Sequence, residues 1–154
     1  MGNDTSVTSI AAEHLLRLPI RLRGIDVGHA VDVILEPEGR RALGLDVLCK
    51  DEAHRFLPFT AAQIGEGEIT VASALTLLAA DELAFYRKRA STVRLLRGAL
   101  VQLKGKDVGH LEDVLVASDG TIAALIVNGA DGATRYELED TLRITADPRR
   151  VSAA

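Results

Sequence analysis

Two aspartate–histidine pairs are the residues of this sequence whose types and spacing could do chemistry. Asp26 precedes His29 by three residues in the phrase GIDVGHAVDV, and Asp107 precedes His110 by the same interval in GKDVGHLEDV. Carboxylate and imidazole groups bind divalent metals and exchange protons, so either pair could support metal-dependent hydrolysis. On an extended strand, however, residues three apart point to opposite faces, and a metal site needs three or four ligands where each phrase offers one histidine. We therefore keep a metal-dependent hydrolase as a minor alternative and predict no enzyme activity, catalytic residue, metal or cofactor.

The two phrases are copies of one another, which favours a structural explanation. Seven of their ten positions are identical, and the phrases begin 81 residues apart, at Gly24 and Gly105. Glycine after a basic residue is typical of a tight turn, because glycine adopts positive φ at little cost. An aspartate in an otherwise apolar strand more often accepts backbone hydrogen bonds at a bulge than takes part in catalysis. We interpret six of the shared residues as a structural motif: Gly24, Gly28, Asp32, Gly105, Gly109 and Asp113.

The segments around each phrase predict β-strands in the same order. Before the first phrase, Ile20 and Leu22 alternate with arginines, which is the period-two pattern of a half-buried strand. Turn sequences follow the two phrases at residues 37–40 and 118–121, and each turn leads into an apolar run that we expect to be a strand. Pro58 is expected to end or edge its strand, since it cannot donate a hydrogen bond to a neighbouring strand.

The pattern changes between the two copies. Residues 81–90 start with an aspartate that can cap a helix, and basic residues follow toward the other end, where they suit the helix dipole. We therefore expect a mainly β fold with two small antiparallel β-barrels joined by a helical linker that packs. The predicted boundaries are residues 14–73 for the first barrel, 74–92 for the linker and 93–146 for the second barrel, with disordered tails at 1–8 and 147–154.

The order of these features resembles the PRC-barrel family. The resemblance is carried by the pattern G-x-x-V-G-x-x-x-D-V, an acidic glycine turn, an apolar strand and then RFLPF at residues 55–59. The second copy has RYELED at residues 135–140 in place of the segment that contains proline. Resemblance to this family implies small, strongly bent antiparallel barrels that serve as adaptor or assembly surfaces, without a shared catalytic residue. Similar barrels occur in a photosynthetic reaction-centre subunit, in a ribosome maturation factor and beside membrane transporters.

The composition limits the possible functions. Aromatic residues make up 3% of the chain and Trp is absent, which argues against the aromatic stacking platforms of single-stranded nucleic acid binding. The net charge of −4 argues against indiscriminate binding to phosphate backbones. The single cysteine, Cys49, is predicted to be an inert buried thiol, and with no apolar leader or membrane span it favours a cytoplasmic location. His14 and His54 are assigned no role.

Charge is unevenly distributed along the chain, and its middle is basic. No acidic residue occurs between residues 87 and 106, although the protein as a whole is acidic. Such a segment is either a solvated face that pairs with acidic groups of the same chain or a docking surface for a partner. We call the following residues the basic strip and predict that they contact a partner: Arg87, Lys88, Arg89, Arg94, Arg97, Lys104 and Lys106.

These observations together favour a non-enzymatic adaptor or assembly module. The expected partner is a protein, at a membrane-associated complex or a transporter, and the other candidates for the strip are an anionic membrane surface and a ribosomal component. The alternative function is that of a ribosome-maturation or RNA-processing accessory factor. Two similar β units can also cover each other's strand edges in a pseudo-twofold arrangement, or pair between chains as a homodimer.

Overall fold

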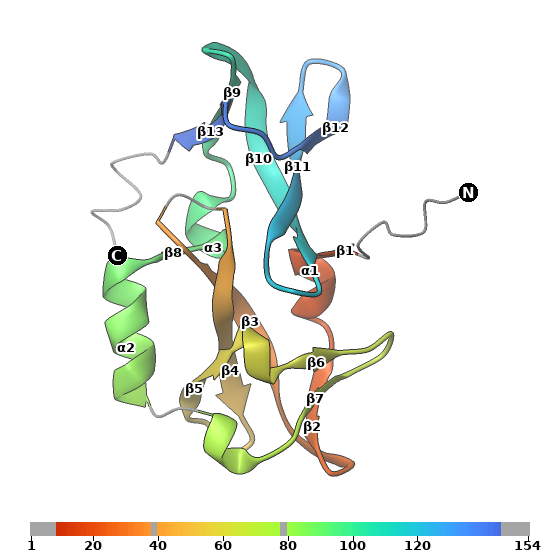
Figure 1. Cartoon of the computed structure of the whole chain (residues 1–154), viewed down its shortest axis with the longest axis vertical. Helices are drawn as coiled ribbons and strands as arrows, with labels where there is room; N and C mark the ends of the chain where they lie inside the picture. Colours follow the sequence, from red (N-terminus) through yellow and green to blue (C-terminus); the bar gives the residue numbers. More distant parts are fainter. Residues whose placement is uncertain (1–8, 38–39, 78–79, 146–154) are drawn as a thin grey trace.

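The computed structural model describes residues 9–37, 40–77 and 80–145, and over these residues the protein is mainly β. Two curled sheets form the upper and lower parts of the molecule in Figure 1, with short helices beside them. The prediction of a mainly β fold is therefore confirmed. The predicted disordered tails at 1–8 and 147–154 lie outside the described residues.

The first sheet collects the strands of the first sequence copy. The strands that this copy contributes are β2 (Pro19–Leu22), β3 (Ile25–Leu35), β4 (Ala42–Cys49), β5 (His54–Pro58), β6 (Gln63–Ile64) and β7 (Ile69–Val71). The strands lie in the order β5-β4-β3-β2-β7-β6. Pro58 ends β5, which is an edge strand of this sheet, so the prediction for this proline is confirmed.

The second sheet collects the strands of the second copy. The strands that this copy contributes are β9 (Leu100–Leu103), β10 (Lys106–Ala117), β11 (Ile122–Gly129), β12 (Gly132–Glu137) and β13 (Leu142–Thr145). The strands lie in the order β12-β11-β10-β9-β13. In both sheets the repeated phrase forms the longest strand, β3 or β10, and the turn before it.

One strand pair departs from the expected antiparallel pattern. β7 runs parallel to β2, with Ile20 opposite Ile69, whereas β13 runs antiparallel to β9. In the first half, the 3-10 helix η2 (Phe59–Ala61) and the hairpin of β6 and β7 follow β5, and the hairpin adds a reversal of the chain before β7. Apolar alternation predicts which face of a strand is buried but not the direction in which the strand runs.

Each half of the molecule sends a short leading segment to the other half. β1 (Ser9–Ala11), which precedes the first sheet, pairs with the end of β10. β8 (Ser91–Thr92), which precedes the second sheet, pairs with the end of β3. A one-turn helix follows each segment: α1 (Ala12–Leu15) lies against β10, and α3 (Val93–Leu96) lies against β3. The two halves therefore exchange equivalent segments, as expected for a pseudo-twofold arrangement.

The halves also meet where the turns after the two phrases come together. A bridge joins Arg41 at the start of β4 to Thr121 before β11. The Ala42 N–H donates to the carbonyl oxygen of Gly120 at 2.7 Å, and the Ile122 N–H donates to that of Arg40 at 3.1 Å. These hydrogen bonds connect the two sheets directly through their backbones.

One continuous hydrophobic core joins the two sheets. Val33 on β3 and the equivalent Val114 on β10 are both fully buried in it. Leu15 of α1 and Leu96 of α3 add side chains from the exchanged segments. The core consists almost wholly of Val, Leu, Ile and Ala, in line with the few aromatic residues of the sequence. Each half therefore completes the core of the other.

The segment between the halves contains helix α2 (Ala80–Arg89), after the 3-10 helix η3 (Ala74–Thr76). This range agrees with the helix predicted at residues 81–90 to within one residue. Leu83 packs with Ile34 and Phe56 in a small cluster separate from the main core, on the opposite face of the first sheet. The Tyr86 ring stacks on that of Phe56 with 4.3 Å between the centroids. The predicted packing of this helical segment is therefore confirmed.

Candidate functional site

The repeated phrase starts with a tight hairpin turn in both halves. Arg23 and Gly24 connect β2 to β3 with φ values of 53° and 81°, and Lys104 and Gly105 connect β9 to β10 with 52° and 80°. Two-residue turns with positive φ at both positions match the right-handed twist of antiparallel strands. The predicted glycine turns are confirmed, and each places a cation at the tip of a hairpin.

The second glycine of the phrase is required by a close approach of two strands. A Cβ atom at Gly28 would overlap the carbonyl oxygen of Leu48 on β4, and one at Gly109 would overlap that of Asn128 on β11. Both glycines also have positive φ, at 155° and 143°. These positions accept no side chain, so the shared glycine has a structural cause.

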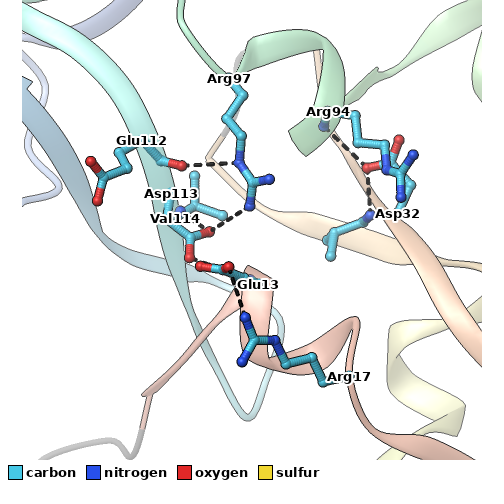
Figure 2. Close-up of polar contacts among 9 residues, drawn as sticks. Glu13, Arg17, Asp32, Arg94, Arg97, Glu112, Asp113 and Val114 are labelled. Atoms are coloured by element: carbon cyan, nitrogen blue, oxygen red, sulfur yellow. Dashed lines mark hydrogen bonds and ion pairs between the residues drawn. The ribbon is translucent and has the colours of Figure 1, made fainter.

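Asp32 lies at a bulge in β3, where the register with β4 shifts between Ala30 and Asp32. Its Oδ1 accepts hydrogen bonds from the backbone N–H of Val33, at 2.8 Å, and from that of Arg94, at 3.2 Å. Arg94 lies in the first turn of α3, so the carboxylate holds the exchanged segment of the other half against β3 (Figure 2).

Asp113 occupies the equivalent bulge in β10. Its Oδ1 accepts from the Val114 N–H at 2.8 Å, and its Oδ2 accepts from the Glu13 N–H, in the first turn of α1, at 3.3 Å. The Arg97 guanidinium lies 3.9 Å from Oδ1, and its Nε donates to the carbonyl oxygen of Glu112 at 3.0 Å (Figure 2). Both aspartates therefore accept backbone hydrogen bonds at a bulge, as predicted, and one donor of each comes from the opposite half.

Burial raises the pKa of both carboxyl groups above the usual value for aspartate. Backbone hydrogen bonds act in the opposite direction at Asp32 and Asp113, as does the positive charge of Arg97 at Asp113, but desolvation is the larger effect. One hydrogen bond of each carboxyl, from the Arg94 N–H or the Glu13 N–H, joins the two halves.

The two aspartate–histidine pairs lie at the surface. Asp26 is 3.8 Å from the Nζ of Lys50, and both His29 and His110 are exposed, as is Asp107. Among the residues that the structure describes, no group of three or more His, Cys, Asp or Glu side chains could hold a metal ion. Neither pair therefore gains, in this part of the chain, the further ligands that a metal site needs.

The basic strip covers three elements of the fold. Its residues are Arg87, Lys88 and Arg89 on α2, Arg94 in α3 and Arg97 directly after it, and Lys104 and Lys106 around the turn between β9 and β10. Lys88, Arg94, Lys104 and Lys106 are exposed to solvent. Arg97 is half-buried, and its guanidinium contacts Asp113 within the chain. Among the side chains of the strip that the structure describes, Arg97 pairs with an acidic residue of the same chain, and exposed cations lie on both sides of it in the sequence.

An aspartate–histidine contact that the sequence analysis missed joins β4 and β5. Asp46 is 1% exposed, and its Oδ1 lies 2.9 Å from the Nδ1 of His54, whose side chain is 44% exposed. A carboxylate in the apolar run LGLDVLC was the available signal, because a charge buried among apolar residues requires a polar partner. His54 is therefore held by a buried carboxylate, although no role was assigned to it from the sequence.

Cys49 is a free, buried cysteine at the end of β4. Burial raises the pKa of its thiol; the positive charge of Arg55 acts against this effect and the negative charge of Asp51 adds to it, and burial is the largest cause. A thiol with a raised pKa carries little of the nucleophilic thiolate at neutral pH. The prediction of a buried thiol is confirmed, and its environment does not activate it.

Comparison of the chain with protein-family models and with curated proteins identifies no relative. No protein-family model matches the chain, and none of the curated proteins matches it. Within the described residues, none of the helices has the length and apolar character needed to cross a bilayer. The function must therefore be inferred from the residues and their contacts.

Proposed function

We propose that the protein is a non-enzymatic adaptor of the cytoplasm, and that it binds a protein partner through the basic strip. The observation that carries this proposal is the structural use of the repeated phrase. Asp32 and Asp113 bind backbone N–H groups of exchanged segments, and Gly28 and Gly109 lie where a side chain would overlap a neighbouring strand. The most distinctive residues of the chain thus build a rigid body, which suits a binding module better than a reaction centre.

The adaptor is built, in this proposal, from two PRC-barrel-like units in tandem. The units span residues 14–73 and 93–146, and the helical segment 74–92 links them. The order of hairpin turn, bulged strand and further antiparallel strands in each sheet supports this assignment. The exchange of leading segments then holds the two units as one surface, so a partner can contact both at once.

The charge of the basic strip supports a partner with an acidic surface. Lys88, Arg94, Lys104 and Lys106 are exposed, and opposite charges across an interface steer association and select partners. Arg97 is half-buried and pairs with Asp113, so it belongs to the fold more than to the binding surface. An acidic protein, at a membrane-associated complex or transporter, is the partner that we propose.

A charge-neutralised variant tests this proposal. Changing Lys88, Arg94 and Lys106 together to Gln removes three exposed positive charges and leaves the backbone hydrogen bonds of the fold in place. A matched variant changes three exposed cations elsewhere to Gln: Arg17, Lys50 and Arg143. Wild type and the matched variant should capture the same acidic protein from cell extract at about 0.1 M salt and lose it at about 1 M, because salt screens exposed charges. The strip variant should fail to capture it at either salt concentration.

Two results would contradict the proposal. Equal recovery of the same protein by both variants would show that the strip is only a solvated face. Capture that disappears after ribonuclease treatment, or binding to vesicles of anionic lipid without any protein partner, would assign the strip to RNA or to a membrane surface instead.

A further inference from the structure

The outer edge of β12 is free of any described strand. β12 is the last strand of the second sheet, and it pairs with β11 on one side only. In Figure 1 it lies at the outside of the upper sheet, with no described element along its free edge. Five of its six residues are exposed, and Tyr136 is half-buried.

The hydrogen-bonding pattern identifies the groups that this edge presents. The Leu138 N–H donates to the carbonyl oxygen of Ala123 on β11, at 3.1 Å. Antiparallel pairs alternate between residues that bond to the neighbour and residues that face away, so the backbones of Ala133, Arg135 and Glu137 face outward. The edge therefore offers three N–H groups and three carbonyl groups at regular spacing.

This edge lacks several of the features that usually prevent strands from pairing between molecules, and its two charged residues have opposite signs. Its register with β11 runs without a bulge, and its sequence GATRYE has no proline and no lysine. The equivalent edge strand of the first sheet, β5, ends in Pro58 and packs against α2 through Phe56 and Leu83. The corresponding edge strands of the two halves therefore differ: β5 ends in a proline and carries α2 on one face, whereas β12 has neither feature.

Charge along β12 selects one way of pairing it with a second copy. Arg135 and Glu137 lie two residues apart, so their side chains share a face of the strand, and within one chain they form an ion pair. In an antiparallel pair of two β12 strands centred on Tyr136, Arg135 is opposite Glu137 of the partner subunit, and this contact occurs twice. Both residues have outward-facing backbones, so this register also satisfies the hydrogen-bonding pattern. Moving the centre to Arg135 would place two arginines opposite each other.

We propose that β12 is a dimerisation edge at which a second copy of this chain adds in the antiparallel direction, extending the second sheet across a twofold axis. Opposite charges at facing positions stabilise a strand pair, and like charges destabilise it. The two cross-strand pairs replace the ion pair within each chain, so no charge loses its partner. This interface is separate from the basic strip, so its test does not depend on the proposed adaptor function.

Charge reversal tests the dimer and its register together. Arg135→Glu and Glu137→Arg each place like charges opposite one another, and each should raise the dimer dissociation constant about 10-fold to 100-fold in sedimentation velocity. The double variant Arg135→Glu/Glu137→Arg restores opposite charges and should restore the dimer. An equimolar mixture of the two single variants should form a heterodimer for the same reason. Arg143→Glu, an exposed charge reversal on β13, is the control and should leave the dimer intact.

Three results would overturn the proposal. A wild-type protein that stays monomeric up to its solubility limit would exclude the dimer. A dimer that survives both single reversals would place the interface elsewhere on the molecule. Failure of the double variant to recover, with its thermal unfolding unchanged, would exclude the register centred on Tyr136.

Discussion

At the scale of single residues, Asp32 and Asp113 show which hydrogen bonds can be predicted from neighbouring residues in the sequence and which cannot. A carboxylate in an apolar strand predicts a bulge and a bond to a nearby N–H, and each aspartate accepts from the residue that follows it. The second donors, Arg94 and Glu13, lie 62 and 100 residues away, so no local pattern identifies them. The contact of Asp46 with His54 was missed for a related reason, because its two groups lie on different strands.

The two aspartates should respond differently to replacement by asparagine. Both backbone N–H groups that donate to Asp32 bond to Oδ1, whereas Asp113 uses Oδ1 for one N–H and Oδ2 for the other. Asparagine has a single side-chain oxygen, so Asp32→Asn can keep both backbone hydrogen bonds, whereas Asp113→Asn leaves one of the two N–H groups without its acceptor. We expect Asp113→Asn to lower the free energy of unfolding by about 1 to 3 kcal/mol more than Asp32→Asn. Urea unfolding at neutral pH measures both values, and equal losses would contradict this difference.

The raised pKa of Asp32 gives a pH dependence of definite sign. The folded protein holds this proton more tightly than the unfolded chain, because burial disfavours the charged carboxylate. The resulting stabilisation is complete below the unfolded pKa, about 3.9, and is lost as the pH rises through the higher folded value. The free energy of unfolding of wild type minus that of Asp32→Asn should therefore fall as the pH increases from about 4 to 7. Urea titrations at several pH values provide the measurement, and a difference that rises with pH would exclude this assignment.

At the scale of elements, the sequence predicts strands, turns and the packed helix α2, because these depend on residues close together in the chain. Gly24 and Gly105 make the predicted turns, and Pro58 ends its strand. The parallel pairing of β7 with β2 was not predicted, since alternation of apolar residues carries no information about strand direction. The residues of the basic strip lie on three separate elements, and their spacing in the sequence did not predict this, because it depends on the fold.

Glycines of the repeated phrase should differ in their tolerance of a side chain. Gly28→Ala would overlap the backbone of β4 and is expected to cost about 3 kcal/mol or more. Gly24→Ala meets no atom within 4 Å but requires a positive φ, so about 1 to 2 kcal/mol is expected. Gly67→Ala meets no neighbouring atom either and is the control, with little change. Urea midpoints of the three variants should follow this order, and an equal loss at Gly24 and Gly28 would show that the strands can separate.

At the scale of the whole molecule, the exchange of leading segments makes the two halves depend on each other. β1 and α1 complete the second half, and β8 and α3 complete the first, around one shared core. The sequence repeat predicts two similar units. It does not predict against which unit each leading segment packs, because the equivalent strands of the two units have equivalent edges. Either copy could accept its own segment or that of its neighbour, and long-range packing decides between them.

Replacing one buried side chain in an exchanged helix with alanine should therefore destabilise both sheets. Leu15 of α1 is fully buried in the shared core, so Leu15→Ala should lower the free energy of unfolding by about 2 to 4 kcal/mol. Because the core is continuous, hydrogen-exchange protection should fall by the same amount in β3 and in β10, and urea unfolding should stay a single transition. Leu75→Ala removes a side chain that is 87% exposed and should leave protection unchanged in both strands. A loss confined to β10, or two separate unfolding transitions, would mean that the halves fold independently despite the exchange.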